Sequence, residues 1–329
     1  MTALQQHVRR TIRRHALLPP DSRVLVGLSG GSDSVALTLL LQELAEYGEF
    51  RVVALAYLHH GLRASADRDE TFCREFAVRR ALPFIVETAN IQAYADAEGL
   101  SIEDAARRVR YTFLERAARD AGADRVAVGH TQDDQAETFL LKLMRGAGLT
   151  GLAAIYPRRG SVIRPLLDVT DGDLQEYLRT RGELWVEDET NEDLENPRNR
   201  IRHRVLPELD RAAGGPTRAA IARAAGLARE DAQWLDELSR ARFGELAVDT
   251  ARGLELDVQQ LAAAPPPLRR RVLLQAMRSV AEGKEIGLDH VESVMALLGG
   301  TQGGVDVPGS RVELCGGKVV LVRQGVGSR

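Results

Sequence analysis

The feature that most constrains the fold is the stretch from Val24 to Ser34, where an apolar run passes directly into a turn of glycine and serine. The run itself, Val-Leu-Val-Gly-Leu at 24–28, is typical of a buried central strand in a parallel sheet. Residues 35–44 are rich in Leu and Ala, which favour a helix. The sequence therefore predicts a strand, a tight turn and a helix, in that order.

The turn has the composition of an anion-binding site. Glycine lets the backbone approach a ligand closely, and a helix N-terminus offers free amide groups and a positive dipole end. Serine hydroxyls add donors, and a carboxylate beside them can hold a magnesium ion that bridges phosphates. We expect Asp33 to be that metal ligand, although a plain Gly-Ser turn capped by Asp33 is the alternative. The expected phosphate-binding residues are Ser29, Gly30, Gly31, Ser32, Asp33 and Ser34.

The rest of the first 213 residues alternates between short apolar runs and helical segments. This alternation predicts an α/β fold with a doubly wound parallel sheet. Further strands are expected at 52–58, 83–86 and 125–129, and further helices at 10–16, 67–80, 101–121, 133–145 and 171–180. Ala-Gly-Gly-Pro at 213–216 predicts a hinge. The expected domains are therefore a catalytic domain at 1–213 and a smaller, mainly helical domain at 217–329 that ends in a β-hairpin.

Charge and composition limit the classes of function. The net charge is only −3, but arginines crowd between residues 198 and 223, which suits a substrate that carries phosphates. A solvated helix face is the alternative. The two cysteines, Cys73 and Cys315, lie far apart, which argues against a zinc, iron–sulfur or disulfide framework. Because no run of about 18 apolar residues occurs, we expect no membrane span and a cytoplasmic protein.

A second candidate group follows the strand expected at 125–129. His130 stands at the end of that strand, and Asp134 and Glu137 are three residues apart on the next helix, so they share a face. A histidine with two carboxylates can orient an amine and accept its proton. The alternative is that Thr131 and Asp134 form a capping box and serve only the helix.

A third group lies on the helix expected at 101–121, where Arg107, Arg110 and Tyr111 share one face. Arginine and tyrosine together can hold a phosphate and stack on a base. A salt-bridge ladder on the surface is the plainer interpretation of such a run.

Taken in order along the chain, these motifs resemble the tRNA(Ile)-lysidine synthase family of PP-loop ATP-pyrophosphatases. The resemblance is strong over about the first 210 residues. The motifs that carry it are the 29–34 turn, His59-His60-Gly61-Leu62-Arg63, Ala106-Arg107 with Arg110-Tyr111, Gly129-His130 with Asp133-Asp134 and Glu137-Thr138, Arg145-Gly146 with Gly148, Arg164-Pro165-Leu166-Leu167 and Arg198-Asn199-Arg200-Ile201-Arg202.

The resemblance implies a two-step reaction that uses ATP and Mg²⁺. Oxygen 2 of the wobble cytidine in an isoleucine tRNA with a CAU anticodon attacks the α phosphate, and pyrophosphate leaves. The ε-amine of free L-lysine then displaces AMP from carbon 2. The implied partners are the tRNA and lysine, with a homodimer left open. The implied catalytic residues are Asp33, Arg110, His130, Asp134 and Glu137, and the implied tRNA contacts are His60, Arg63, Arg107, Arg145, Arg198, Arg200 and Arg202.

Three other functions remain open at this point. A tRNA thiolase of the same superfamily would need reactive or cluster-binding cysteines, and the first domain holds only Cys73. A small-molecule ligase of the superfamily would bring a glutaminase domain with an N-terminal cysteine, whereas position two is Thr2. A nucleotide-sensing module without catalysis would release pyrophosphate slowly or not at all.

Overall fold

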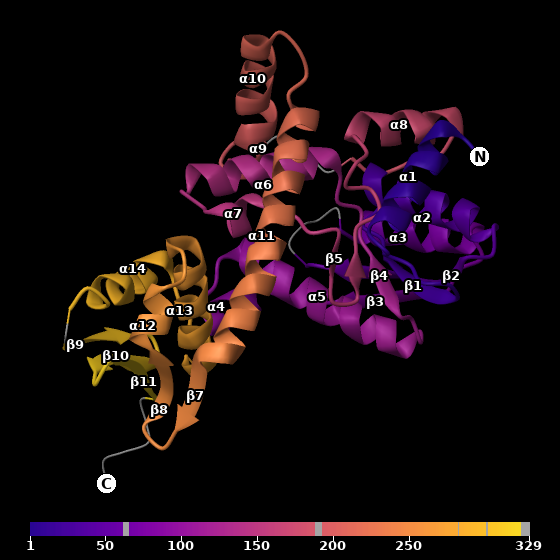
Figure 1. Ribbon diagram of the computed structural model, residues 1–329. Helices are drawn as coiled ribbons and strands as arrows, with labels where there is room; N and C mark the ends of the chain where they lie inside the picture. Colours follow the sequence, from indigo (N-terminus) through magenta and orange to yellow (C-terminus); the bar gives the residue numbers. More distant parts are fainter. Residues whose placement is uncertain (62–65, 188–192, 282, 301, 324–329) are drawn as a thin grey trace. The chain divides into compact units, whose positions relative to one another are not determined.

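The computed structural model describes residues 1–61, 66–187, 193–281, 283–300 and 302–323. The chain forms two compact units, Met1–Arg229 and Glu230–Arg329 (Figure 1). The break expected at 213–216 is the turn between helices α10 (Leu206–Ala213) and α11 (Arg218–Leu246), and α11 contains the point at which the two units divide. The functional limits expected from the sequence, 1–213 and 217–329, stay a prediction.

A six-stranded sheet forms the centre of the first unit, in the order β3-β2-β1-β4-β6-β5. All neighbouring strands are parallel except the edge pair β5–β6, so the doubly wound parallel sheet is confirmed. The strands are β1 (Ser22–Gly27), β2 (Phe50–His59), β3 (Phe84–Thr88), β4 (Arg125–Ala127), β5 (Arg158–Arg159) and β6 (Val162–Ile163).

Helices cover both faces of this sheet because the side chains of β1 alternate between two cores. Val24 and Val26 pack with helices α1, α2, α3 and α8, whereas Leu25 packs with α5 on the other face. The helices of the first unit up to α8 are α1 (Ala3–Arg14), α2 (Ser32–Ala45), α3 (Ala66–Arg79), α4 (Ile91–Glu98), α5 (Ile102–Asp120), α6 (Gln132–Met144), α7 (Leu149–Leu152) and α8 (Asp171–Thr180).

Helix α2 is held firmly because it is apolar on nearly every side. Leu37, Leu40 and Leu41 have no exposed surface, and each contributes about 1.5–3 kcal/mol by its burial. The N-terminus of α2 directly follows the carboxyl end of β1, at the point where the chain changes direction across the sheet between β1 and β4. Ligands of such sheets bind at this point.

Farther along the first unit lies the arginine-rich segment, which forms three consecutive helical pieces. It consists of α9 (Pro197–Arg200), a π-helical turn η2 (Ile201–Val205) and α10. Ile201 and Leu206 of this segment pack with Ala136 and Leu140 of α6 in a small core of their own. Single π turns occur often at functional sites, because they accommodate one more residue per turn.

The second unit has a five-stranded antiparallel sheet in the order β7-β8-β11-β10-β9, packed against α13 and α14. The hairpin expected at 311–322 is confirmed as β10 and β11, but three further strands escaped prediction. All three are short, and β9 begins with two glycines, which have low strand propensity. The elements are β7 (Ala247–Thr250), β8 (Gly253–Asp257), α12 (Val258–Ala262), α13 (Pro266–Val280), α14 (Leu288–Leu297), β9 (Gly303–Val307), β10 (Ser310–Cys315) and β11 (Lys318–Arg323).

Over the described part of the chain, no helix combines the length and the apolar character that a membrane span requires.

Candidate active site

The 29–34 turn has the geometry of an anion cradle. Gly30 has φ +88°, a conformation that favours glycine, and a Cβ there would lie 3.3 Å from Cys73 Sγ. The Ser34 hydroxyl accepts a hydrogen bond from the backbone N–H of Ser29 at 3.1 Å and donates to the carbonyl of Gly31 at 3.0 Å. Gly31 is the N-cap of α2 and makes no side-chain capping bond, so the first amide groups of α2 are left for an anion.

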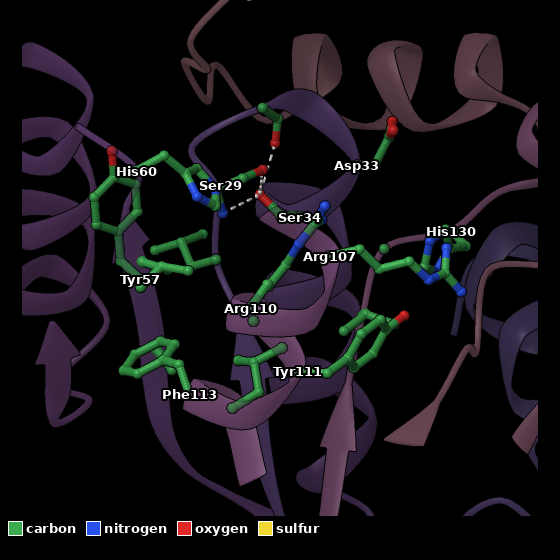
Figure 2. A pocket seen from close by; sticks show the side chains of 18 of the residues that line it. Ser29, Asp33, Ser34, Tyr57, His60, Arg107, Arg110, Tyr111, Phe113 and His130 are labelled. Atoms are coloured by element: carbon green, nitrogen blue, oxygen red, sulfur yellow. Dashed lines mark hydrogen bonds between the residues drawn. The ribbon is translucent and has the colours of Figure 1, made fainter. Parts of the chain in front are cut away.

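The turn forms one wall of a cavity of about 500 Å³. Most of the residues that sequence analysis singled out for catalysis, phosphate binding or tRNA contact line this cavity together (Figure 2). Those residues are Ser29, Gly31, Asp33, Ser34, His60, Arg107, Arg110, His130, Asp134 and Arg198. The carboxyl ends of β1, β2 and β4 thus meet helices α5 and α9 at a single site.

One side of the cavity is apolar and suits a nucleobase. Leu58 of β2 packs with Phe113 and Leu114 of α5 there, whereas Tyr57 belongs to the core on the other face of the sheet. All four residues line the cavity, and Figure 2 shows Tyr57 and Phe113 on the side away from His130. Apolar side chains next to an anion cradle have the chemistry of a nucleotide site.

Asp33 is one of three neighbouring carboxylates. Burial, reinforced by the negative charges of Asp171 and Asp134, raises the pKa of Asp33 to about 8. Ser32 donates a hydrogen bond to Asp33 at 3.1 Å, and the charge of Arg202 also opposes this rise. Among the described residues, no three ligands are placed to enclose a metal ion. This arrangement fits Mg²⁺, which is commonly held by one or two carboxylates together with substrate phosphates.

His130 follows β4 and lines the cavity, where its ring is held from behind by a buried arginine. The guanidinium Nε of Arg164 donates to His130 Nδ1 at 3.2 Å, and Arg164 is only 3% exposed. Burial and the positive charges of Arg164, Arg110 and Arg198 lower the pKa of His130 well below its usual value, against the charge of Asp134. The imidazole is therefore neutral near physiological pH.

Asp134 has the two roles that the sequence left as alternatives. It completes a capping box, since its N–H donates to the Thr131 hydroxyl at 3.3 Å and its carboxylate accepts from the Thr131 N–H at 3.0 Å. The same side chain lines the cavity. The capping box is therefore confirmed, while a catalytic role for Asp134 stays a prediction.

Glu137 lies on the same face of α6 but has no exposed surface and does not line the cavity. Its carboxylate accepts from Arg202 Nε at 2.5 Å, and Arg198 Nε lies 3.4 Å away. Burial raises the pKa of Glu137 to about 7 against the hydrogen bond from Arg202. Despite its own burial, Arg202 has its pKa raised by Glu137. Glu137 thus joins α6 to the arginine-rich segment.

The other residues implied as tRNA contacts occupy different places. Arg107 is exposed and stacks on Tyr111, with its guanidinium carbon 5.5 Å from the ring centre. Arg145 is exposed at the C-cap of α6. Arg200 is exposed, and its Nη1 donates to the carbonyls of Leu194 and Glu195 at 2.9 and 2.8 Å. Arg63 lies outside the described residues.

Sequence analysis missed two residues of the site. Arg164 was noted only as part of a family motif, and Asp171 was placed only at the start of a helix. The Thr131 hydroxyl donates to Asp171 at 2.6 Å, and burial with the neighbouring charge of Asp133 raises the pKa of Asp171 to about 6. The signal that could have found them is positional, because both residues follow the last parallel strand at the edge where ligands bind.

Comparison with known proteins agrees with this geometry. A family model described as a PP-loop domain matches residues 2–209, and a second, described as a TilS substrate binding domain, matches residues 256–324. A curated tRNA(Ile)-lysidine synthase of Chlorobaculum tepidum is 32% identical over 95% of this chain and 94% of its own length. The chain belongs to the tRNA(Ile)-lysidine synthase family.

Other relatives extend this finding. The tRNA(Ile)-lysidine synthases of Geobacter sulfurreducens and Symbiobacterium thermophilum are 39% and 38% identical over 90% and 97% of this chain. The chain spans 63% of the length of the first and 69% of the second. Among solved structures, a U34-tRNA thiolase from Methanococcus maripaludis superposes with a TM-score of 0.56 at 16% identity, over 69% of this chain and 78% of the thiolase. This likeness shows a shared fold.

Proposed function

We propose that this lysidine synthase family member attaches lysine to carbon 2 of the wobble cytidine in tRNA(Ile) with a CAU anticodon. The reaction consumes ATP and releases pyrophosphate and AMP. The observation that carries the proposal is the single cavity in which the 29–34 turn, His130 and Asp134 meet. A site that both activates an oxygen and receives an amine needs these two parts side by side.

The first step is adenylation of the cytidine. The apolar side of the cavity receives the adenine, and the free amides of α2 with the serine hydroxyls bind the leaving pyrophosphate. Arg110, on the cavity wall, stabilises the charge that develops on the α phosphate. Asp33 would hold Mg²⁺, whose positive charge neutralises the phosphate oxygens. A cation there would also relieve the repulsion between Asp33, Asp134 and Asp171.

The second step is attack by the ε-amine of lysine on carbon 2, which expels AMP. Lysine is almost wholly ammonium at neutral pH, with a side-chain pKa of about 10.4. Asp134, open to the cavity, binds this ammonium and accepts its proton as the group is desolvated. Glu137 contributes from behind, because Arg198 and Arg202 lie close to both carboxylates.

The tRNA approaches over the arginine-rich segment. Arg200 and Arg204 are exposed, so their charges are open to phosphates, whereas Arg198 and Arg202 are partly buried against α6. Basic groups of this kind fix the position of a nucleic acid through its backbone. Binding of free lysine, of Mg²⁺ and of the CAU-anticodon tRNA, and a homodimer, are parts of this proposal.

AMP release tests the proposal, measured with purified protein, ATP, lysine and a CAU-anticodon transcript, omitting each in turn. We expect AMP only when all four are present, and adenylated tRNA with pyrophosphate when lysine alone is omitted. Asp134→Ala should still form the adenylate but fail to use lysine, and Asp33→Asn should form none. If Asp134→Ala loses adenylation while it still transfers lysine to a preformed adenylate, the assignment of the two steps is wrong.

A tRNA thiolase is the main competitor because the thiolase structure shares the fold and holds a [4Fe-4S] cluster. The two cysteines of this chain lie in different units, at Cys73 and Cys315. Burial raises the pKa of the Cys73 thiol to about 12, which makes it a poor nucleophile and a poor metal ligand. The cysteine chemistry of this chain therefore favours the ligase.

A further inference from the structure

Arg164 is a buried cation that sequence analysis gave no role. It lies just after β6, is 3% exposed, and has no ion pair with any carboxylate in the part of the chain that the structure describes. Its three hydrogen bonds go to neutral acceptors: His130 Nδ1 at 3.2 Å, the carbonyl of Tyr156 at 2.8 Å and the Tyr111 hydroxyl at 3.1 Å. A charge buried without a counter-ion is costly, so its presence calls for an explanation.

The contact with His130 restricts where that ring can carry its proton. A guanidinium is always protonated and only donates, so Nδ1 of His130 must offer its lone pair. The single proton of the neutral ring then sits on Nε2. A protonated ring would set two donors against each other at the Arg164 contact.

The other ring nitrogen is available to a ligand. Within the described chain, His130 Nε2 has no hydrogen-bond partner. It does not count as a buried polar atom without a partner, so it is accessible to a ligand. The ring lines the same cavity as the 29–34 turn. The charged groups that act on it are Arg164 behind the ring, Asp134 on α6, Arg110 on α5 and Arg198 on α9.

From this geometry we infer that Arg164 is a positioning residue that fixes His130 as a neutral imidazole whose Nε2–H donates to the phosphate of the bound nucleotide. This inference rests on the proposed function, since the phosphate is that of ATP. It deepens that function by excluding His130 as the base: Nε2 already carries its proton, and Nδ1 is occupied. The proton of the lysine ammonium therefore goes to a carboxylate rather than to His130. The guanidinium also polarises the ring, which makes Nε2–H a stronger donor without a full charge.

The direct test is the side-chain ¹⁵N spectrum of His130 in the full chain, without nucleotide, between pH 5.5 and 8. His130 is one of seven histidines, so its signals are assigned by their loss in His130→Asn. We expect a neutral ring with the proton on Nε2 over the whole range. A proton on Nδ1, or a ring that titrates near pH 6.5, overturns the inference with the wild-type protein alone.

Variants of Arg164 separate positioning from packing. Arg164→Gln should give a mixture of tautomers and a ring that titrates at higher pH. Arg164→Lys retains a charged donor and should restore the Nε2–H form. Tyr111→Phe is the packing control, because it removes the Nη2 partner but leaves the bond to His130. An unchanged His130 spectrum in a folded Arg164→Gln overturns the inference.

Catalysis provides the second measurement. Arg164→Gln should lower kcat for pyrophosphate release about 10- to 100-fold with little change in the KM for ATP, and Arg164→Lys should recover part of the loss. A normal kcat in Arg164→Gln would also overturn the inference. If the wild-type protein released no pyrophosphate, the proposed function would fail, whereas the spectrum would still decide the tautomer.

Discussion

Replacing Asp33 with asparagine should stabilise the ligand-free protein while it abolishes adenylation. The carboxylate of Asp33 is held beside Asp171 and Asp134, and burial with their charges raises its pKa to about 8. The folded chain thus keeps a proton that the unfolded chain, with a carboxyl pKa of about 3.9, releases. Above pH 4, the ionisation of this group in the unfolded chain lowers the free energy of unfolding. This loss of stability increases with pH until the pH passes about 8.

The magnitude follows from the two pKa values. At pH 8 the difference of about four pKa units corresponds to roughly 5 kcal/mol without screening, at about 1.36 kcal/mol per unit. Asp33 is only partly buried, so solvent screens the charges. We therefore expect Asp33→Asn to gain on the order of 1–2 kcal/mol, with a smaller gain at pH 5 because less of the opposition is present there.

Thermal unfolding followed by circular dichroism, without nucleotide or Mg²⁺, measures this effect. We expect the Tm of Asp33→Asn to rise by about 2–6 °C at pH 8 and by less at pH 5. Asp69→Asn is the matched control, because Asp69 also lines the cavity but pairs with Arg68 rather than with the cluster. The reasoning is refuted by a Tm that falls at pH 8, or by an equal gain at both pH values or in both variants.

Three further predictions concern the surroundings of the site. Gly129→Ala should lower the rate of adenylation, because its Cβ would lie 3.1–3.2 Å from backbone atoms of Asp33 and displace the turn, as pyrophosphate release would show. Glu137→Ala should lower the free energy of unfolding by about 2–3 kcal/mol in urea denaturation, since it leaves the partly exposed arginines of α9 and η2 without their main partner. Arg200→Ala with Arg204→Ala should lower the salt slope of tRNA binding by about one unit each and leave ATP affinity unchanged; an unchanged slope would favour a solvated face.

The parts of the fold that could be predicted are those that local sequence determines. The strand, turn and helix from Val24 to Leu44 were predictable because periodicity, glycine and capping act over a few residues. The capping box at Thr131 was predictable for the same reason. The five-stranded sheet of the second unit was not, because the pairing of β8 with β11 joins segments more than 60 residues apart. Strands as short as these can be recognised only from the strands with which they pair in the folded sheet.

The candidate site shows the same division. Ser29 and His130 could be named because each follows the end of a buried strand, and Asp33 because it belongs to the glycine-serine turn at the start of a predicted helix. The contacts that set their chemistry are long-range: Arg164 meets His130 across 34 positions, and Arg202 meets Glu137 across 65. Arginines grouped along the sequence suggested one basic surface. In the folded chain these arginines divide into two groups: Arg200, Arg204, Arg211 and Arg223 are exposed, whereas Arg198, Arg202 and Arg218 pair with carboxylates of α6.

A backbone hydrogen bond joins the 29–34 turn to a distant part of the chain: the N–H of Val186 donates to the carbonyl of Gly30 at 2.9 Å. Val186 also lines the cavity and lies in the connection between α8 and α9. A nucleotide that displaced Gly30 would therefore strain this bond to the chain beyond α8. Thermodynamic reciprocity then requires that any effect of ATP on the affinity for tRNA be matched by an equal effect of tRNA on the affinity for ATP.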